Sequence, residues 1–293
     1  MFTLDVASLW PFRVKANGHA ALHAAEAAPP VGGAPQPRTE DDLARVLSPT
    51  QVSTFLECSA KWWYKHGLRL PEQKSSNLGI GIAFHDAVME NFRQKVDTKE
   101  DLPVPGTRAL FRASWNSMKG DLVFGPKEHA DDLREMGEDL VDEYMTKVAP
   151  RIEPAAVEQE VTGNIGGVKV RGRIDVLDVS GRIIDAKTAS KKPAGISPNY
   201  RFQVATYAKL HGQASGRVRL DTVTKTKTIQ LVEQSFAIAE SDLVQIERMY
   251  PLAQEAMRSG LYVPNRNSNL CSQRYCPFWA HCEDDYGGAV DEQ

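Results

Sequence analysis

Apolar positions between residues 48 and 148 recur at helical spacing. Ser48 and Pro49 have the composition of a helix N-terminus. The apolar residues that follow lie three and four apart, on one helix face: Val52, Phe55 and Leu56. A second helix is expected to begin near Asn77, because an apolar stripe repeats there every four residues: Phe84, Val88 and Phe92. Both segments are therefore predicted to pack one face against a core.

The rest of this half is predicted from its turn residues and charges. The segment DLPVPGT, residues 101–107, is typical of a loop. Helical sequence rich in acids then runs to about Val148, and Ala149-Pro150 ends it.

The apolar pattern changes to a period of two after residue 155. Residues 155–188 alternate in the manner of strands, with a turn at Ser180-Gly181. Two further strands are expected over 217–226 and 228–238.

Two helices accompany these strands. Ser197-Pro198 predicts the start of one, which Gly212 ends. The other opens at Ser241, is kinked by Pro251 and ends at Gly260. Helices, strands, a helix, two strands and a helix predict an α/β fold of the mixed α+β kind, with a central mixed sheet flanked by helices.

Residues 1–47 are expected to be an N-terminal extension. An Ala-rich stretch at 20–28, which has the composition of a short helix, leads into the Pro/Gly-rich linker PPVGGAPQP. The domain itself is predicted over 48–293.

Composition excludes several classes of protein. The 293 residues carry 35 Lys and Arg against 38 Asp and Glu, a net charge of -3, which argues against a polybasic nucleic-acid coat. No apolar run approaches the roughly 18 residues of a membrane span, and the first residues lack a secretory signal. We therefore expect a cytoplasmic protein without a membrane partner.

An acid-x-Lys pattern occurs three times and does not identify a site by itself: Glu72-x-Lys74, Asp97-x-Lys99 and Asp185-x-Lys187. Only the third lies in a predicted strand, where residues two apart point to the same face. A three-residue loop of Val179, Ser180 and Gly181 would place Asp175 opposite Asp185 on that face, whereas a two-residue turn would place it opposite Ala186. The longer loop needs its third residue in the left-handed conformation, which favours glycine.

Two adjacent carboxylates repel each other unless a cation neutralises them. A divalent metal with oxygen ligands does so and keeps positions for water and a phosphate oxygen. Lys187 could then orient or deprotonate that water and offset charge in phosphoryl transfer. The alternative is an exposed, ion-paired pair of strands without a site.

The motifs resemble those of PD-(D/E)XK nucleases, in their RecB-like and Cas4-like branch. The matching segments occur in the family's order: Gly79-x-Gly81-x-x-x-His85, Gly172-Arg173-Ile174-Asp175, Asp185-x-Lys187-Thr188 and Gln203-x-x-x-Tyr207. The resemblance covers roughly residues 48–283 and implies a restriction-endonuclease-like core.

That resemblance implies a role for each motif residue. Asp175, Asp185, His85 and the carbonyl of Ala186 would bind Mg²⁺ or Mn²⁺, with Lys187 as the catalytic lysine. Gln203 and Tyr207, on one helix face, would reach DNA phosphate or the metal-bound water. The family often has an acid on the preceding strand, which suggests Glu160, although Glu158 has the same strand parity.

All four cysteines form a set of one plus three: Cys58, Cys271, Cys276 and Cys282. Thiolates suit zinc or an iron–sulfur cluster, and spacing alone leaves both open. Iron-containing nucleases of this branch also use one cysteine before the core and three after it, which implies a [4Fe–4S] cluster with zinc as the alternative. The first interval here, C-x4-C, is wider than the family's usual C-x2-C. Four aromatic residues are expected to shield the site: Trp62, Trp63, Phe278 and Trp279.

Six cations fall within 31 residues around the proposed site and suit a phosphate backbone: Arg171, Arg173, Lys187, Lys191, Lys192 and Arg201. Nothing resembles a base-reading element or a P-loop. The predicted function is a metal-dependent exonuclease on single-stranded DNA or DNA ends. The alternatives are a structure-specific endonuclease, and a Cas4-like processing subunit that works with a recombination, helicase or integrase partner.

Overall fold

The computed structural model of the protein describes residues 42, 44–212 and 216–291. The Ala-rich stretch and almost all of the linker expected before residue 42 lie outside these residues. Among the described residues, no helix combines the length and the apolar character needed to cross a membrane.

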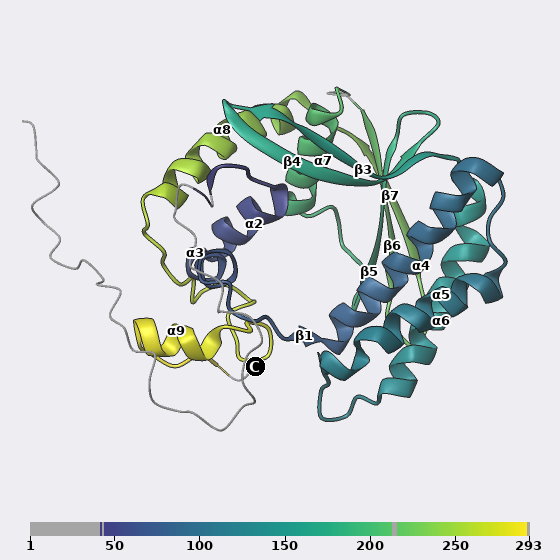
Figure 1. Cartoon of the computed structure of the whole chain (residues 1–293), viewed down its shortest axis with the longest axis horizontal. Helices are drawn as coiled ribbons and strands as arrows, with labels where there is room; N and C mark the ends of the chain where they lie inside the picture. The colour runs from purple at the N-terminus through teal and green to yellow at the C-terminus, as the bar shows by residue number, and fades with distance from the viewer. Residues whose placement is uncertain (1–41, 43, 213–215, 292–293) are drawn as a thin grey trace, which may run out of the picture. The chain divides into compact units, whose positions relative to one another are not determined.

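A five-stranded mixed sheet forms the centre of the fold (Figure 1). Its strands are β3 (Pro154–Ile165), β4 (Val168–Asp178), β5 (Ile183–Ala189), β6 (Arg217–Thr224) and β7 (Leu231–Ala237), in that spatial order. Only β5 and β6 run parallel, and α7 (Pro198–Leu210) connects them. Parallel neighbours need such a crossover, whereas the antiparallel pairs are joined by short turns or loops.

Helices cover both faces of the sheet (Figure 1). One face packs against α2 (Pro49–Glu57), α7 and α8 (Glu240–Arg258), with a first core that includes Val52, Tyr207 and Tyr250. The other face packs against α4 (Ser76–Thr98), α5 (Val104–Met118) and α6 (Ala130–Lys147) around a second core that includes Phe84 and Trp115. The predicted mixed α/β fold is confirmed.

Shorter elements connect these layers. They are α3 (Ser59–Trp62), a π-helical turn (Trp63–Gly67), two 3₁₀ turns (Lys119–Asp121 and Ala149–Arg151), and α9 (Trp279–Tyr286). A small parallel pair, β1 (Lys74–Ser75) and β2 (Leu122–Val123), lies beside the start of α4.

Several helix boundaries follow the predicted caps, and others do not. Ser48 caps α2 with a reciprocal hydrogen-bond pair involving Gln51, and Ser197 caps α7. The segment 101–107 is not wholly a loop, because α5 begins at Val104 with proline just inside its first turn. The last long helix begins at Glu240, one residue before the predicted Ser241.

The folded unit begins before the expected boundary at residue 48. The amide of Leu47 donates to the carbonyl of Lys169 at 3.0 Å, and the amide of Arg171 donates to the carbonyl of Leu47 at 2.9 Å. Ala44 and Leu47 are fully buried in the first core. Leu47 therefore pairs with the part of β4 that precedes its short pairing with β5.

Candidate active site and cysteine-lined pocket

The turn between β4 and β5 sets the register of the site. The amide of Asp178 donates to the carbonyl of Arg182 at 3.0 Å, so three residues form the loop, and its third residue, Gly181, has φ 75°. Val176 pairs with Ile184. Counting along both strands places Asp175 opposite Asp185, so the register predicted from the turn is confirmed.

Asp175 lies where β4 separates from β5. The paired residues end at Val176, whereas β5 continues beside β6 through Ala189. On β3, the residue opposite Asp175 is Glu158, which has φ 49°. Glu158 marks a change of face in β3, since Val161 packs in the first core and Val157 against the second. Strands β4 and β5 thus diverge beyond Val176, and the carboxylates of Asp175 and Asp185 lie where they diverge.

The Asp175 and Asp185 carboxyl groups lie within hydrogen-bonding reach of each other. Asp185 is 3% exposed, and burial, reinforced by the charge of Asp175, raises its pKa to about 6 against the opposing charge of Lys187. Burial acts in the same direction on Asp175, but the hydrogen bond and charge of His85 outweigh it and lower the pKa of Asp175. The two carboxyls therefore have different proton affinities.

His85 reaches the carboxylates from α4. Its Nε2 lies 3.5 Å from Oδ2 of Asp175. Burial would lower the pKa of His85, but the hydrogen bond and charge of Asp175 raise it. One turn earlier, a Cβ at Gly81 would lie 3.2 Å from Oγ1 of Thr188, so the glycine leaves room for the close approach of α4 to β5. This accounts for a glycine one turn before the histidine.

Gln203 and Tyr207 contact each other on α7. Nε2 of Gln203 donates to the Tyr207 hydroxyl at 2.8 Å. The Tyr207 ring fills the space above Gly172, where a Cβ would lie only 2.5 Å from a ring carbon. The Tyr207 ring of one predicted motif thus explains why the other has a glycine at position 172.

Glu158, rather than Glu160, lies near the site. Glu160 is exposed opposite Arg173 on β4. The charge of Glu158 contributes to the raised pKa of His85, and its carboxylate also pairs with Arg173 at 3.3 Å and Arg93 at 2.6 Å. Parity could not separate the two acids, because the positive φ of Glu158 breaks the alternation.

The donor chemistry fits a hard divalent cation, since two carboxylates and an imidazole converge. Oδ2 of Asp185 is buried and, apart from the ion pair with Lys187, meets no hydrogen-bond donor among the described residues. These candidate ligand groups approach one another two at a time, His85 with Asp175 and Asp175 with Asp185. No three His, Cys, Asp or Glu side chains in the described part of the chain are gathered closely enough to hold an ion as they stand.

One residue of the predicted basic strip forms an ion pair within the protein. Arg201 is held by Asp242 through two contacts of 3.0 and 2.5 Å and lies over the Phe236 ring at 4.7 Å. It therefore fastens α7 to the start of α8, with its side chain 34% exposed. Four of the other cations stay exposed on β4 and on the loop after β5: Arg171, Arg173, Lys191 and Lys192.

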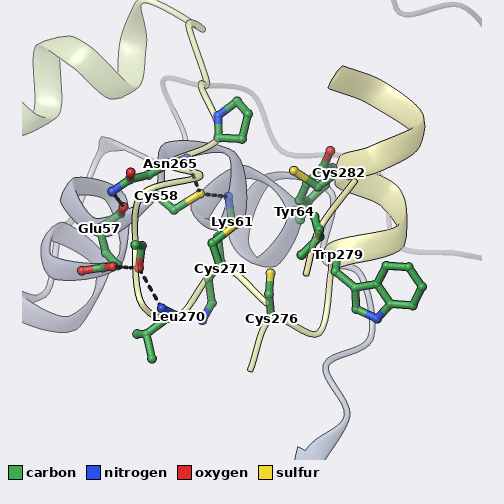
Figure 2. Close-up of a pocket in the computed structure, with 13 residues that line it drawn as sticks. Glu57, Cys58, Lys61, Tyr64, Asn265, Leu270, Cys271, Cys276, Trp279 and Cys282 are labelled. Atoms are coloured by element: carbon green, nitrogen blue, oxygen red, sulfur yellow. Dashed lines mark hydrogen bonds between the residues drawn. The ribbon is translucent and has the colours of Figure 1, made fainter. Parts of the chain in front are cut away.

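The four cysteines line one pocket (Figure 2). Cys58 ends α2 and caps α3, whereas the other three come from the C-terminal segment and α9: Cys271, Cys276 and Cys282. All four thiols are free. Burial raises the pKa of Cys276, and it raises that of Cys282 to about 11 with a smaller contribution from the other cysteines.

Backbone amides point at the Cys58 sulfur. The amides of Lys61 and Asn265 lie 3.4 and 3.5 Å from its Sγ (Figure 2). The side chain of Ser59 accepts from the amide of Val263 at 2.8 Å, and the side chain of Asn265 donates to the carbonyl of Glu57 at 2.9 Å. The C-terminal segment is thus attached to the α2–α3 junction.

The aromatic residues around the pocket differ in part from those predicted. Phe278 is buried beside Cys282, and Trp279 lines the pocket. Trp62 packs in the first core instead. Trp63 stacks on Tyr262, with ring centres 4.7 Å apart, and also packs against the cluster that contains Phe278 and Cys282. A wall residue not predicted from the sequence is Tyr64, whose hydroxyl donates to Asp285 at 2.7 Å. A tyrosine directly after two tryptophans gave no separate signal.

Comparison with known proteins follows the same lines. In solved structures, the fold is similar to a protein from Eubacterium rectale named "Putative exonuclease", with a TM-score of 0.55 and 12% identity over 79% of this chain and 89% of that one. SSO0001 is 17% identical over 79% of this chain and 96% of that one, with a TM-score of 0.36. A search of curated proteins finds no significant match.

The model of the PD-(D/E)XK nuclease superfamily matches residues 46–283. This range contains the strands that carry Asp175, Asp185 and Lys187, the helices on both sides of the sheet and the four cysteines. The chain belongs to the PD-(D/E)XK nuclease superfamily.

Proposed function

We propose that this nuclease is a metal-dependent exonuclease that acts on single-stranded DNA or DNA ends. The observation that carries the proposal is the point where β4 separates from β5, at which Asp175, Asp185 and Lys187 meet. The fold similarity to the Eubacterium rectale protein named "Putative exonuclease" and the motif resemblance support end-dependent cleavage.

Four groups would hold the metal: the side chains of His85, Asp175 and Asp185, and the carbonyl of Ala186. When bound, a divalent cation activates water and neutralises phosphate charge. Ionised carboxylates are needed for this, and the raised pKa of Asp185 means that the site loses a ligand as the pH falls through about 6. Oδ2 of Asp185 is buried with no described hydrogen-bond donor other than Lys187, which supports its assignment as a ligand.

Lys187 is the cationic member of the site. Burial would lower its pKa, but the charges of Asp185 and Asp175 raise it above the ordinary value. The ammonium is therefore protonated at neutral pH. Of its two possible roles, this favours orienting water and offsetting negative charge over deprotonating water.

The test is a pair of substrates of one sequence, a circular and a linear single strand, incubated with Mn²⁺ or Mg²⁺. An exonuclease degrades the linear strand and leaves the circle intact. Label at the 5′ or 3′ end gives the polarity, and an RNA strand of the same sequence tests the sugar preference.

Asp185→Ala, purified in the same way, controls for a contaminating nuclease. Equal loss of circle and line by the wild type alone would replace the exonuclease with an endonuclease. No cleavage of any strand would remove the proposed activity.

We also propose a [4Fe–4S] cluster on Cys58, Cys271, Cys276 and Cys282. The four cysteines line one pocket, and thiolates suit either zinc or a cluster. The resemblance to the iron-containing nucleases of this branch favours the cluster. Amides directed at the Cys58 sulfur stabilise a thiolate there.

A further inference from the structure

A second pocket lies next to Lys187, between α2, α7 and the loop after β5. Its polar lining includes hydroxyl and amide side chains and one cation, among them Thr50, Ser53, Lys187, Asn199, Tyr200 and Gln203. None of the described residues that line it is acidic. A pocket with a cation, hydroxyls and no carboxylate suits an anionic ligand.

Tyr200, in the first turn of α7, is one of the residues that line this pocket. The residue is 6% exposed, and its Oη is buried without a hydrogen bond among the described residues. Nζ of Lys187 lies 5.8 Å from the centre of its ring. A buried hydroxyl without a partner destabilises the fold, so we look for a partner outside the protein.

The hydroxyl is available as a donor. Burial, with the charges of Asp185 and Asp175, holds the pKa of Tyr200 well above its ordinary value. Oη therefore keeps its proton at neutral pH and can donate to an oxygen anion. Those same carboxylates repel an anion, and the charge of Lys187, which interacts with both, offsets that repulsion without a metal.

We propose that this pocket binds a phosphate of the substrate strand adjacent to the scissile one, and that the Tyr200 hydroxyl donates to it. The proposal rests on the proposed function, because it assigns a substrate subsite to the same active site. It adds a residue outside the recognised motifs, three positions before Gln203 on the same helix.

Tyr250 provides a matched control. It is also buried, but its hydroxyl lies 3.1 Å from Oγ1 of Thr206 and therefore has a partner. Tyr250→Phe should lower the melting temperature and leave nucleic-acid binding unchanged. Tyr200→Phe removes a hydroxyl without a partner and should not lower the melting temperature.

The experiment measures binding of a labelled oligothymidylate in EDTA, where metal-dependent cleavage cannot occur. Tyr200→Phe should weaken binding by about tenfold, the effect of one hydrogen bond to a charged group. An oligomer with neutral methylphosphonate linkages keeps the bases and sugars, and the two proteins should bind it equally.

Unchanged affinity of Tyr200→Phe for the charged oligomer would overturn the proposal. So would an equal loss with the neutral oligomer, since the hydroxyl would then contact a base or sugar. A fall in melting temperature as large as that of Tyr250→Phe would assign Tyr200 to packing and would also overturn it. Because no cleavage is measured, these outcomes are independent of whether the wild type degrades DNA.

Discussion

Nζ of Lys187 lies 2.7 Å from Oδ2 of Asp185, two residues before it on the same strand. Strand geometry places both side chains on one face, so the contact follows from the acid-x-Lys spacing itself. Among the described residues, Oδ2 of Asp185 is buried and meets no other hydrogen-bond donor. Lys187 is the lysine of the proposed site, and it pairs with this oxygen. Each partner is therefore expected to influence the other's chemistry.

Replacing the three central residues should separate metal binding from catalysis. Asp175→Ala, Asp185→Ala and Lys187→Ala should each reduce cleavage by at least about 100-fold. Calorimetric titration with Mn²⁺ should show weaker binding for the two aspartate variants only, since lysine is not a ligand. Near-wild-type turnover in any of the three would remove this site from the mechanism.

The raised pKa of Asp185 makes a signed prediction about pH. Between its ordinary value of 3.8 and its folded value of about 6, the folded protein holds a proton that the unfolded chain has released, so stability falls as pH rises through this window. Asp185→Asn removes the buried charge and should melt higher than the metal-free wild type at pH 7. Melting curves at pH 4 should show a smaller difference, and a constant difference would contradict this origin.

Manganese affinity should change in the opposite sense. Protonated Asp185 is a poor ligand, so affinity should rise between pH 5 and 7 and then level off. Titrations of the wild type over this range test this expectation. A flat profile would show that Asp185 is already ionised at pH 5 or is not a ligand.

The cysteine set predicts a coloured protein. Anaerobically purified protein should be brown, and replacing any one cysteine with serine should bleach it and lower the melting temperature. Iron and sulfide analysis with absorption spectra measures both. Colourless protein with stoichiometric zinc would overturn the cluster and leave the nuclease assignment intact.

The exposed cations and the ion-paired Arg201 should differ in salt dependence. If about three to five cations contact phosphate, log K against log[salt] should have a slope of about -2 to -3.5. Lys191→Ala with Lys192→Ala should flatten this slope by about one unit. Arg201→Ala should instead lower the melting temperature and keep the slope, because Arg201 binds Asp242. A flattened slope for Arg201→Ala would show that Arg201 contacts phosphate.

Gly172 offers a steric test. A Cβ at this position would lie 2.5 Å from the Tyr207 ring, so Gly172→Ala should destabilise the fold by about 1–3 kcal/mol. Combining it with Tyr207→Ala should restore part of the loss. Additive losses measured by denaturant unfolding would show that the two residues do not compete for space.

The sequence predicted what depends on local rules. Caps at Ser48 and Ser197, the stripe at Phe84, Val88 and Phe92, and the three-residue loop ending at Gly181 each follow from neighbouring residues, and each is present in the structure. Register then brought Asp175 opposite Asp185.

Features that depend on distant partners could not be predicted in this way. Arg201 was predicted to contact phosphate, but its ion pair with Asp242, 41 residues later, could not be predicted from the sequence. The choice between Glu158 and Glu160 depended on a positive φ at a non-glycine residue, which no pattern announces. The pocket beside Tyr200 exists only because α2 and α7 lie next to each other.

The attachment of Asn265 to Cys58 also has a consequence for biosynthesis. The two residues are 207 positions apart, so at 5–20 residues per second about 10–40 s separate their appearance from the ribosome. The cysteine-lined pocket cannot exist on a growing chain until its last segment has emerged. Incorporation of the proposed cluster would therefore be a late step, for which Cys58 of the nascent chain has to stay reduced until the other three cysteines have emerged.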